Sequence, residues 1–194
     1  QLLQDTGIFT CAFFVIGLPG ETRAEREETR DAIYDWGLDW AFFNYATPLR
    51  GRELFRQCKE NKWIEEKYLP IGAIDMTDYV ITAPGMDRDE IKNTVFGMNL
   101  DLNFVHNSNL RKGNLKTAYQ TFGEVVDRHP TQPFAQYFLA KCLESLGIGQ
   151  SKVNRHYEIY RSIIQESKTW RDAALRFDLE LEPNYRPHDA KLLR

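Results

Sequence analysis

Residues 8–17 read IFTCAFFVIG, and the residues that follow them, 18–22, read LPGET. The first stretch is an almost unbroken apolar run rich in β-branched and aromatic residues, which is typical of a parallel strand buried on both faces. The Pro-Gly pair ends the strand, and Thr22 with Glu25 forms the T-x-x-E pattern of a capping box, which opens a helix. We therefore predict a strand–turn–helix unit here, with the helix ending at Gly37.

A second unit of the same kind follows directly. We predict a strand over residues 40–46 (WAFFNYA), a turn over 47–51 (TPLRG) and a helix over 53–61. A short strand over 79–83 and a long helix over 87–105 are expected next. Repeated βα units imply a parallel sheet or a barrel, so the fold class expected for this half of the chain is α/β.

The first six residues have the composition of a final helical turn, and Gly7 fits its left-handed C-cap. A helix without a visible beginning indicates that the chain starts inside a domain. We therefore expect the sequence to be a fragment of a longer protein. The strand over residues 8–17 would then have an unpaired edge in the isolated piece, which carries a risk of aggregation.

Composition places the chain among soluble globular proteins. Of its 194 residues, 42% are hydrophobic and 27% charged, which excludes a disordered or collagen-like chain. The net charge of −3 offers no basic surface for nucleic acid, and no apolar run approaches the ~20 residues of a membrane helix. Three widely spaced cysteines, Cys11, Cys58 and Cys142, argue against a disulfide framework and predict a reducing, cytoplasmic location.

Several kinds of catalytic site are not supported by the sequence. The four histidines lie far apart, and no phosphate loop, dinucleotide fingerprint or nucleophile elbow is present. The charge run over residues 25–30 is expected to form a solvated helix face with i,i+4 pairs, and Asp35 and Asp39 a solvated loop. Core packing is expected for the strand aromatics, which are Phe13, Phe14, Phe42, Phe43 and Tyr45.

The second half of the chain changes to helices, and we place the boundary near residues 106–112. The predicted helices cover residues 114–128, 133–146, 152–167 and 170–180. The domains expected are therefore 1–110, an incomplete α/β part, and 111–183, a helical extension, followed by a tail over 184–194.

This helical half carries a repeat-like pattern. Gly113, Leu115, Ala118, Phe122 and Pro130 have the spacing of the second helix of a tetratricopeptide repeat, in which the small Ala lets two helices approach and the Phe fills the groove beside it. About one and a half repeats are visible, whereas a free solenoid generally needs three. Two interpretations stay open: a helical cap on the α/β part, or a groove that binds a protein partner.

The sequence also resembles one enzyme family. Residues 7–29 (GIFTCAFFVIGLPGETRAEREET) resemble the fifth strand–helix unit of radical SAM enzymes, and residues 42–55 (FFNYATPLRGRELF) resemble the sixth. Arg52 stands where a Thr is common in that family. Residues 103–147 resemble the helical tail of a branch that has a cobalamin-binding domain ahead of the barrel. The resemblance implies the C-terminal βα units of a partial (β/α)6 barrel, followed by a tetratricopeptide-like extension.

The family resemblance also implies a chemistry. In radical SAM enzymes a [4Fe–4S] cluster held by C-x3-C-x2-C cleaves S-adenosylmethionine to a 5′-deoxyadenosyl radical, and the branch often methylates or rearranges its substrate. The three cysteines here cannot form that motif. The cluster ligands and any cobalamin site would therefore lie outside this chain, and we expect the fragment alone to be inactive.

What this chain can contribute is one wall of the S-adenosylmethionine pocket, because in the family the ends of the fifth and sixth strands approach the adenine and the ribose–methionine portion. Glycine at such a strand end allows a ligand to approach the backbone closely. Glu21 has an alternative role, since a carboxylate in a first helical turn favours the helix dipole. Carried over by motif position, the candidates are Ile16, Gly17, Glu21, Asn44, Ala46, Thr47, Pro48 and Leu49.

Two further functions stay open at this point. The chain could be a helical protein-interaction module in which the βα units act as a scaffold, with a groove over residues 114–168. It could also belong to a hydrolase on a (β/α)8 barrel, although such a fold needs more βα units downstream. The substrate and the oligomeric state cannot be read from the sequence.

Overall fold

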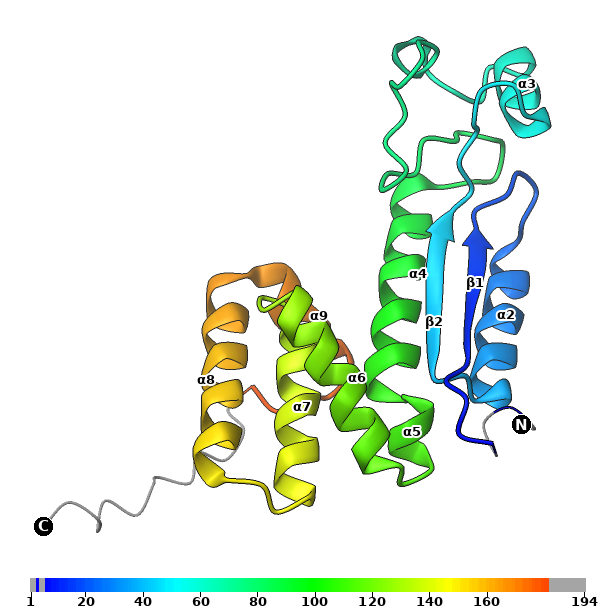
Figure 1. Ribbon diagram of the computed structural model, residues 1–194. Helices are drawn as coiled ribbons and strands as arrows, with labels where there is room; N and C mark the ends of the chain where they lie inside the picture. The colour runs from blue at the N-terminus through cyan, green and yellow to red at the C-terminus, as the bar shows by residue number, and fades with distance from the viewer. Residues whose placement is uncertain (1–2, 4–5, 182–194) are drawn as a thin grey trace, which may run out of the picture. The chain divides into compact units, whose positions relative to one another are not determined.

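The computed structural model describes residue 3 and residues 6–181 (Figure 1). The chain divides into two compact units, Gln1–Asn103 and Phe104–Arg194, and each is treated by itself. The helical turn expected over residues 1–6 falls mostly on residues outside this description, and the tail expected over 184–194 lies wholly outside it.

The first unit contains two strands and several helices. Its elements are β1 (Cys11–Ile16), α2 (Arg23–Trp36), β2 (Trp40–Tyr45), α3 (Glu53–Glu60), the short 3-10 helix η1 (Glu66–Tyr68) and α4 (Arg88–Leu100), which continues into the π-helical turn η2 (Asp101–Val105). The strands pair in parallel, with Cys11 opposite Trp40 and Ile16 opposite Tyr45. The βαβ unit and the helices predicted from the sequence are therefore confirmed, although β1 begins three residues after the predicted start and α4 ends at Leu100, where the π-helical turn follows.

Local sequence signals account for the bounds of α2. The Thr22 side chain accepts a hydrogen bond from the N–H of Glu25, and the Glu25 carboxylate accepts one in return from the N–H of Thr22, at 2.7 Å. Gly37 ends the helix in the left-handed conformation, with φ of 61°. Both ends were predicted because they depend on residues that are close in sequence.

Only one face of the two-stranded sheet is covered by the described helices of this unit. Ile16 and Ala41 are 1% and 2% exposed and pack with residues of α2 and α4, whereas Phe13 and Phe42 are 71% and 41% exposed. The rings of Phe13 and Phe42 stack on each other with centroids 4.6 Å apart. The prediction that the first strand is buried on both faces is therefore wrong for this chain, because no described residue of the unit covers the second face.

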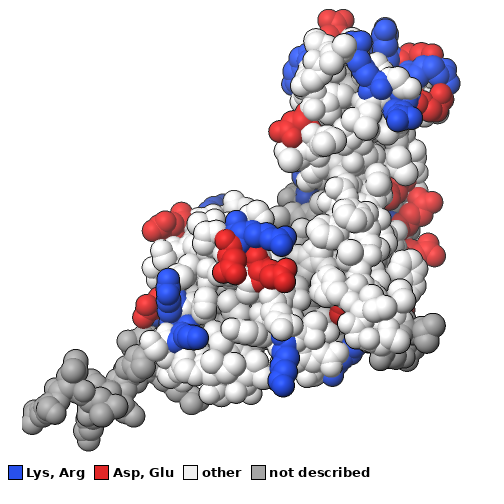
Figure 2. All heavy atoms as spheres, viewed as in Figure 1, with Lys and Arg blue, Asp and Glu red and all other residues white. Residues whose placement is uncertain are grey.

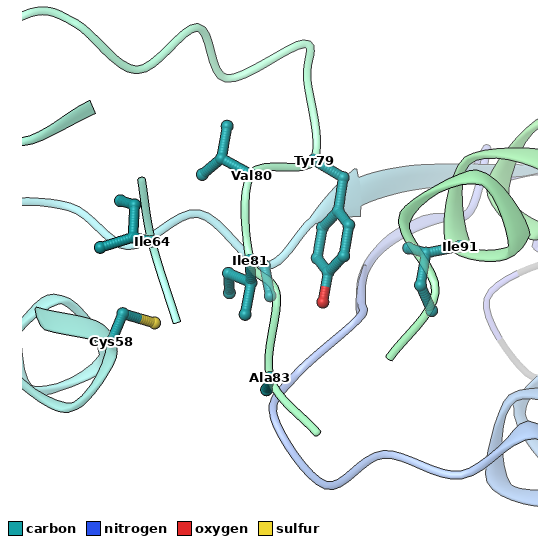
Figure 3. Close-up of a cluster of buried hydrophobic side chains, with 8 residues drawn as sticks. Cys58, Ile64, Tyr79, Val80, Ile81, Ala83 and Ile91 are labelled. Carbon is teal, nitrogen blue, oxygen red and sulfur yellow. The ribbon is translucent and has the colours of Figure 1, made fainter. Parts of the chain in front are cut away.

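Residues 79–83 do not form the predicted strand. The segment is extended and has one backbone hydrogen bond to another segment, from the N–H of Thr82 to the carbonyl of Trp63 at 2.7 Å. Its apolar side chains are buried nevertheless, with Tyr79, Val80 and Ile81 all at most 1% exposed (Figure 3). An apolar run can be buried without a ladder of strand hydrogen bonds, which is why the pattern alone was misleading.

The second unit consists of helices. They are α5 (Ser108–Arg111), α6 (Leu115–Arg128), α7 (Pro133–Ser145), α8 (Gln150–Glu166) and α9 (Lys168–Arg176), and each of the last three packs on the helix before it. Ala118 and Phe122 of α6 are fully buried, and the Phe122 ring lies 6.0 Å from that of Phe138 on α7. The four helices predicted from the sequence are confirmed, and the repeat identity stays a prediction.

Two observations concern helix length and surface charge. In the part of the chain that the structure describes, no helix has the length and apolar character needed to cross a membrane. Acidic and basic side chains are interspersed on the face shown in Figure 2, and they do not gather into one basic patch there.

Candidate functional site

Two turns lie side by side at one edge of the sheet. Because β1 and β2 are parallel neighbours, their carboxyl ends meet at the same edge, and the N–H of Ala46 donates to the carbonyl of Ile16 at 2.8 Å. We call residues 17–21 the first turn and residues 46–49 the second turn. Ligands of open α/β sheets bind at such an edge, so the sequence-predicted candidates are brought together where a small-molecule site is expected.

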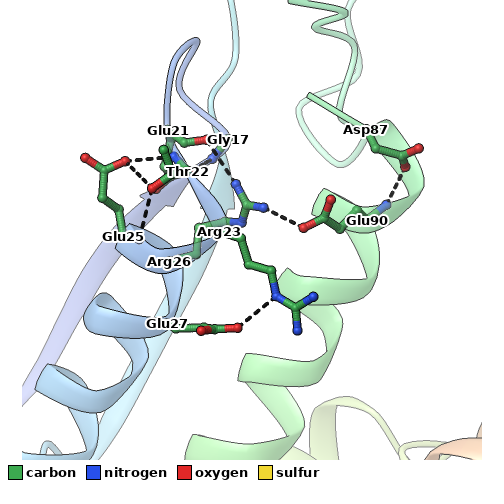
Figure 4. A network of polar contacts seen from close by, with 9 residues as sticks. All are labelled: Gly17, Glu21, Thr22, Arg23, Glu25, Arg26, Glu27, Asp87 and Glu90. Atoms are coloured by element: carbon green, nitrogen blue, oxygen red, sulfur yellow. Dashed lines mark hydrogen bonds and ion pairs between the residues drawn. The ribbon is translucent and has the colours of Figure 1, made fainter. Parts of the chain in front are cut away.

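Gly17 lies close to Glu21, Tyr79 and Ile91, and Figure 4 shows its bond to Glu21. Its N–H donates to the Glu21 carboxylate at 2.5 Å, and its carbonyl accepts from the Tyr79 hydroxyl at 2.8 Å. Its φ of +91° lies in the left-handed region, and an added Cβ would stand 2.7 Å from the Tyr79 ring and 3.1 Å from Ile91. The glycine is therefore required for the packing of Tyr79, independently of any ligand.

Glu21 closes the first turn. Besides its carboxylate bond to Gly17, its own carbonyl accepts from Nη1 of Arg26 at 3.2 Å. The carboxylate stands just ahead of the first residue of α2, where it also favours the helix dipole. The structure thus gives Glu21 a structural use, and contact with a ligand stays a prediction.

Arg26 of α2 is buried, although the sequence predicted a solvated position. Its side chain is 5% exposed, and Nη2 forms an ion pair with Glu90 of α4 at 2.7 Å (Figure 4). The prediction that the run over residues 25–30 is a solvated face is wrong at this position, because Arg26 lies on the side of the helix that packs against α4. One i,i+4 ion pair does involve the run: exposed Glu27 pairs with Arg23, which lies two residues before the run.

The second turn contains both buried and exposed residues. Ala46 and Pro48 are buried, and the Thr47 hydroxyl donates to the main chain of β2 at 3.1 Å. The N–H of Leu49 donates to the carbonyl of Thr47 at 2.9 Å, while the Leu49 side chain remains 48% exposed. Asn44, at the end of β2, is exposed, and within the described residues its side chain amide has no hydrogen bond.

The accessible groups lie on the helix-free side of the sheet. Val15 and Asn44 are paired in register and both exposed, as are Phe13 and Phe42 two residues earlier, so these side chains share one face. Ile16 points the other way into the core under the helices. The edge can therefore offer a ligand an amide at Asn44, apolar surface from Leu49 and aromatic surface below it, but no side chain of Ile16.

The described residues do not hold a metal site. No group of three or more His, Cys, Asp or Glu side chains within residues 6–181 is arranged to bind a metal ion. Cys58 and Cys142 are buried, and burial raises the pKa of both thiols, that of Cys142 to about 11. An iron–sulfur cluster needs several thiolates together, and the described residues hold no such group, so a cluster does not fit the cysteines of this chain.

Two polar residues anchor the opposite end of the sheet and were missed by sequence reasoning. The Asp39 carboxylate accepts from the N–H and hydroxyl of Thr10, both at 2.7 Å, and Asp39 is 7% exposed, so the predicted solvated loop is wrong at this residue. The Asn103 side chain pairs with the N–H and carbonyl of Ala41 at 2.8 and 2.7 Å. For Asp39, the available signal was a polar residue directly before a predicted strand; Asn103 lies in η2 and had no such signal.

An open pocket of about 380 Å³ lies elsewhere, between β1 and the outer side of α2. None of the eight sequence-predicted candidates lines it. Its lining residues are Phe14, Glu25, Glu28, Thr29, Ala32 and Trp36.

The fold and the site define an α/β protein with a candidate small-molecule site at the ends of two parallel strands. Among curated proteins, the chain is similar to the anaerobic magnesium-protoporphyrin IX monomethyl ester cyclase of Rubrivivax gelatinosus, with 36% identity over 97 residues, which are 49% of this chain and 16% of the cyclase. The enzyme of the same name from Cereibacter sphaeroides is 37% identical over 60 residues, 31% of this chain and 10% of that protein.

The chain therefore spans a small part of the length of the curated relatives that it matches. No family model matches the sequence, and no solved structure is significantly similar to it.

Proposed function

We propose that this chain is the C-terminal part of the barrel of a radical SAM enzyme related to these cyclases, and that the edge formed by the two turns binds S-adenosylmethionine. The observation that carries the proposal is the adjacency of the two turns, joined by the Ala46–Ile16 hydrogen bond of 2.8 Å. The sequences of both turns resemble the family, and the similarity to the cyclases supports the same assignment.

The two turns would contact the cofactor in different ways. Asn44 and Leu49 offer accessible polar and apolar groups, so in this proposal they contact the adenine or ribose portion, with the backbone of Thr47 beside them. The N–H of Gly17 is already used by Glu21, so the first turn serves as a rigid wall and not as a donor to the methionyl group. When bound, S-adenosylmethionine supplies a 5′-deoxyadenosyl radical or a methyl group.

The bare face of the sheet supports the barrel assignment. In a (β/α) barrel the helices lie outside and the strands turn their other side chains to the interior. Phe13, Val15 and Phe42 occupy that interior side in this proposal, because α2 and α4 cover the other face. Further strands from the longer protein would close the barrel over these side chains.

Several parts of the proposed enzyme lie beyond this chain. The ligands of a [4Fe–4S] cluster are not among its cysteines, and a cobalamin site, if the enzyme uses one, is assigned to the same missing portion. We propose a cytoplasmic enzyme whose α6–α8 helices form a tetratricopeptide-like extension. The burial of Ala118 and Phe122 supports that extension, which could also receive a protein partner.

The test is S-adenosylmethionine titration of the complete, anaerobically purified protein, with iron content measured in parallel. We expect Asn44→Ala to weaken binding and to leave iron content unchanged. Asn93→Ala is the matched control, because Asn93 is an exposed asparagine of α4 away from the edge. A complete protein that contains no iron, or does not bind S-adenosylmethionine, would remove the assignment.

A further inference from the structure

Tyr79 contacts the first turn and the last residue of β2, although it belongs to neither element. Its hydroxyl donates to the Gly17 carbonyl across a separation of 62 residues, and its ring fills the space that a Cβ at Gly17 would need. The same ring lies 5.9 Å, centroid to centroid, from the ring of Tyr45, the last residue of β2. One buried side chain therefore joins the ends of both strands.

The position of Tyr79 is itself fixed. The residue is fully buried with its neighbours Val80 and Ile81, and its carbonyl accepts from Nε of Arg88 at the start of α4, at 3.0 Å (Figure 3). Burial raises the pKa of Tyr79 to about 12, so the hydroxyl remains a proton donor at neutral pH. A rigid neighbour can hold a turn in one geometry, which is what a binding edge needs.

Arg26 and Glu90 support the same turn from α2 and α4. Arg26 donates to the Glu21 carbonyl through Nη1 and to the Glu90 carboxylate through Nη2, at 3.2 and 2.7 Å. Its Nε is buried and, among the described residues, has no hydrogen-bond partner. Burying a guanidinium with an unsatisfied N–H costs free energy of folding. We therefore infer that Arg26 is kept for the position that it gives to the first turn, and not for its contribution to stability.

We propose that Tyr79 is the positioning residue of the cofactor edge, and that the Arg26–Glu90 ion pair is its second support. Tyr79 acts through Gly17 and Tyr45 and does not contact the cofactor. The inference rests on the proposed function and deepens it, because it assigns control of the edge to the segment that leads into α4.

The test compares two buried tyrosines in the complete protein. Tyr79→Phe removes the hydroxyl and keeps the ring, and Tyr157→Phe removes a buried hydroxyl that donates to Glu144 at 3.2 Å in the helical unit. Both variants should lower the melting temperature slightly. Only Tyr79→Phe should weaken S-adenosylmethionine binding, by about threefold to tenfold, and speed amide hydrogen exchange in a peptide that covers residues 14–24.

A second variant keeps the test decisive if Tyr79→Phe is poorly folded. Glu90→Gln should weaken S-adenosylmethionine binding about twofold, whereas Glu27→Gln, in an exposed pair with Arg23, should not change it. The inference is overturned if the wild-type protein binds S-adenosylmethionine and Tyr79→Phe changes neither affinity nor exchange. A wild-type protein that does not bind S-adenosylmethionine overturns the proposed function. In that case, faster hydrogen exchange in Tyr79→Phe but not in Tyr157→Phe would show that Tyr79 supports the first turn structurally, without a role in cofactor binding.

Discussion

The two turns occupy equivalent places at the ends of neighbouring strands, yet their polar groups are used differently. In the first turn, the N–H and carbonyl of Gly17 both have partners within the unit, and the Glu21 carboxylate is one of them. Beside the second turn, the side chain amide of Asn44 is exposed and has no hydrogen bond within the described residues. The roles that we propose for the two turns in binding therefore differ, although both resemble the same family.

The physical reason is what lies behind each turn. The first turn packs on Tyr79 and Ile91, which fill the space beside Gly17. Side-chain exposure is similar in the two turns, with Leu18 at 47% and Leu49 at 48%, but beside the second turn the exposed Asn44 amide has no hydrogen bond within the described residues. We therefore treat the first turn as the support of the edge and the second as its contact surface, and the following substitutions test that division.

The largest effect is expected from Gly17→Ala, measured against Gly20→Ala. Both glycines have φ near +90°, but an added Cβ meets Tyr79 at 2.7 Å at Gly17 and no atom within 4 Å at Gly20. Backbone strain alone should cost about 1–2 kcal/mol at either position. Overpacking should add roughly 1–3 kcal/mol at Gly17, which urea denaturation of the protein can measure.

Equal losses in the two glycine variants would contradict the division, because they would show that the Tyr79 ring yields freely. The same clash makes Gly17→Val unsuitable as a test of cofactor binding. A Val at this position would disturb the packing of Tyr79 and Ile91 whether or not a ligand is bound.

A smaller loss is expected from Glu90→Ala. The substitution leaves the buried Arg26 guanidinium without its carboxylate partner, which would cost several kcal/mol for a fully buried pair. Because the Glu90 side chain is 45% exposed, water can replace part of the interaction, and we expect about 1–2 kcal/mol in urea denaturation. Glu27→Ala, which breaks an exposed pair, should change stability by less than about 0.5 kcal/mol, and equal effects would show that Arg26 does not support the first turn.

Local signals predicted the elements well. The reciprocal Thr22–Glu25 bonds and the left-handed Gly37 depend on residues within one helical turn, so the sequence contains all that decides them. The four longer helices of the second unit followed from their apolar periodicity in the same way. The adjacency of the two turns followed from the parallel pairing that βα units require.

Long-range partners explain what could not be predicted. The sequence places Arg26 in a charged run that was predicted to be solvated, but its burial depends on the ion pair with Glu90, which is 64 residues away. Tyr79 belongs to an apolar run that is typical of a strand, but its ring packs beside Gly17. Phe13 was expected in the core, but no described residue of the unit covers it. In each case the outcome depends on which surface another part of the protein supplies.

The smallest effect on stability, and the sharpest test of the division, is expected from the pair Leu49→Ala and Leu18→Ala. The two leucines are 48% and 47% exposed, so each substitution should change the free energy of unfolding by no more than about 0.5 kcal/mol. Leu49 belongs to the contact surface and Leu18 to the support. Titration of the complete protein should therefore show S-adenosylmethionine binding about twofold to fivefold weaker for Leu49→Ala and unchanged for Leu18→Ala. The reverse result would assign the contact to the first turn and the support to the second.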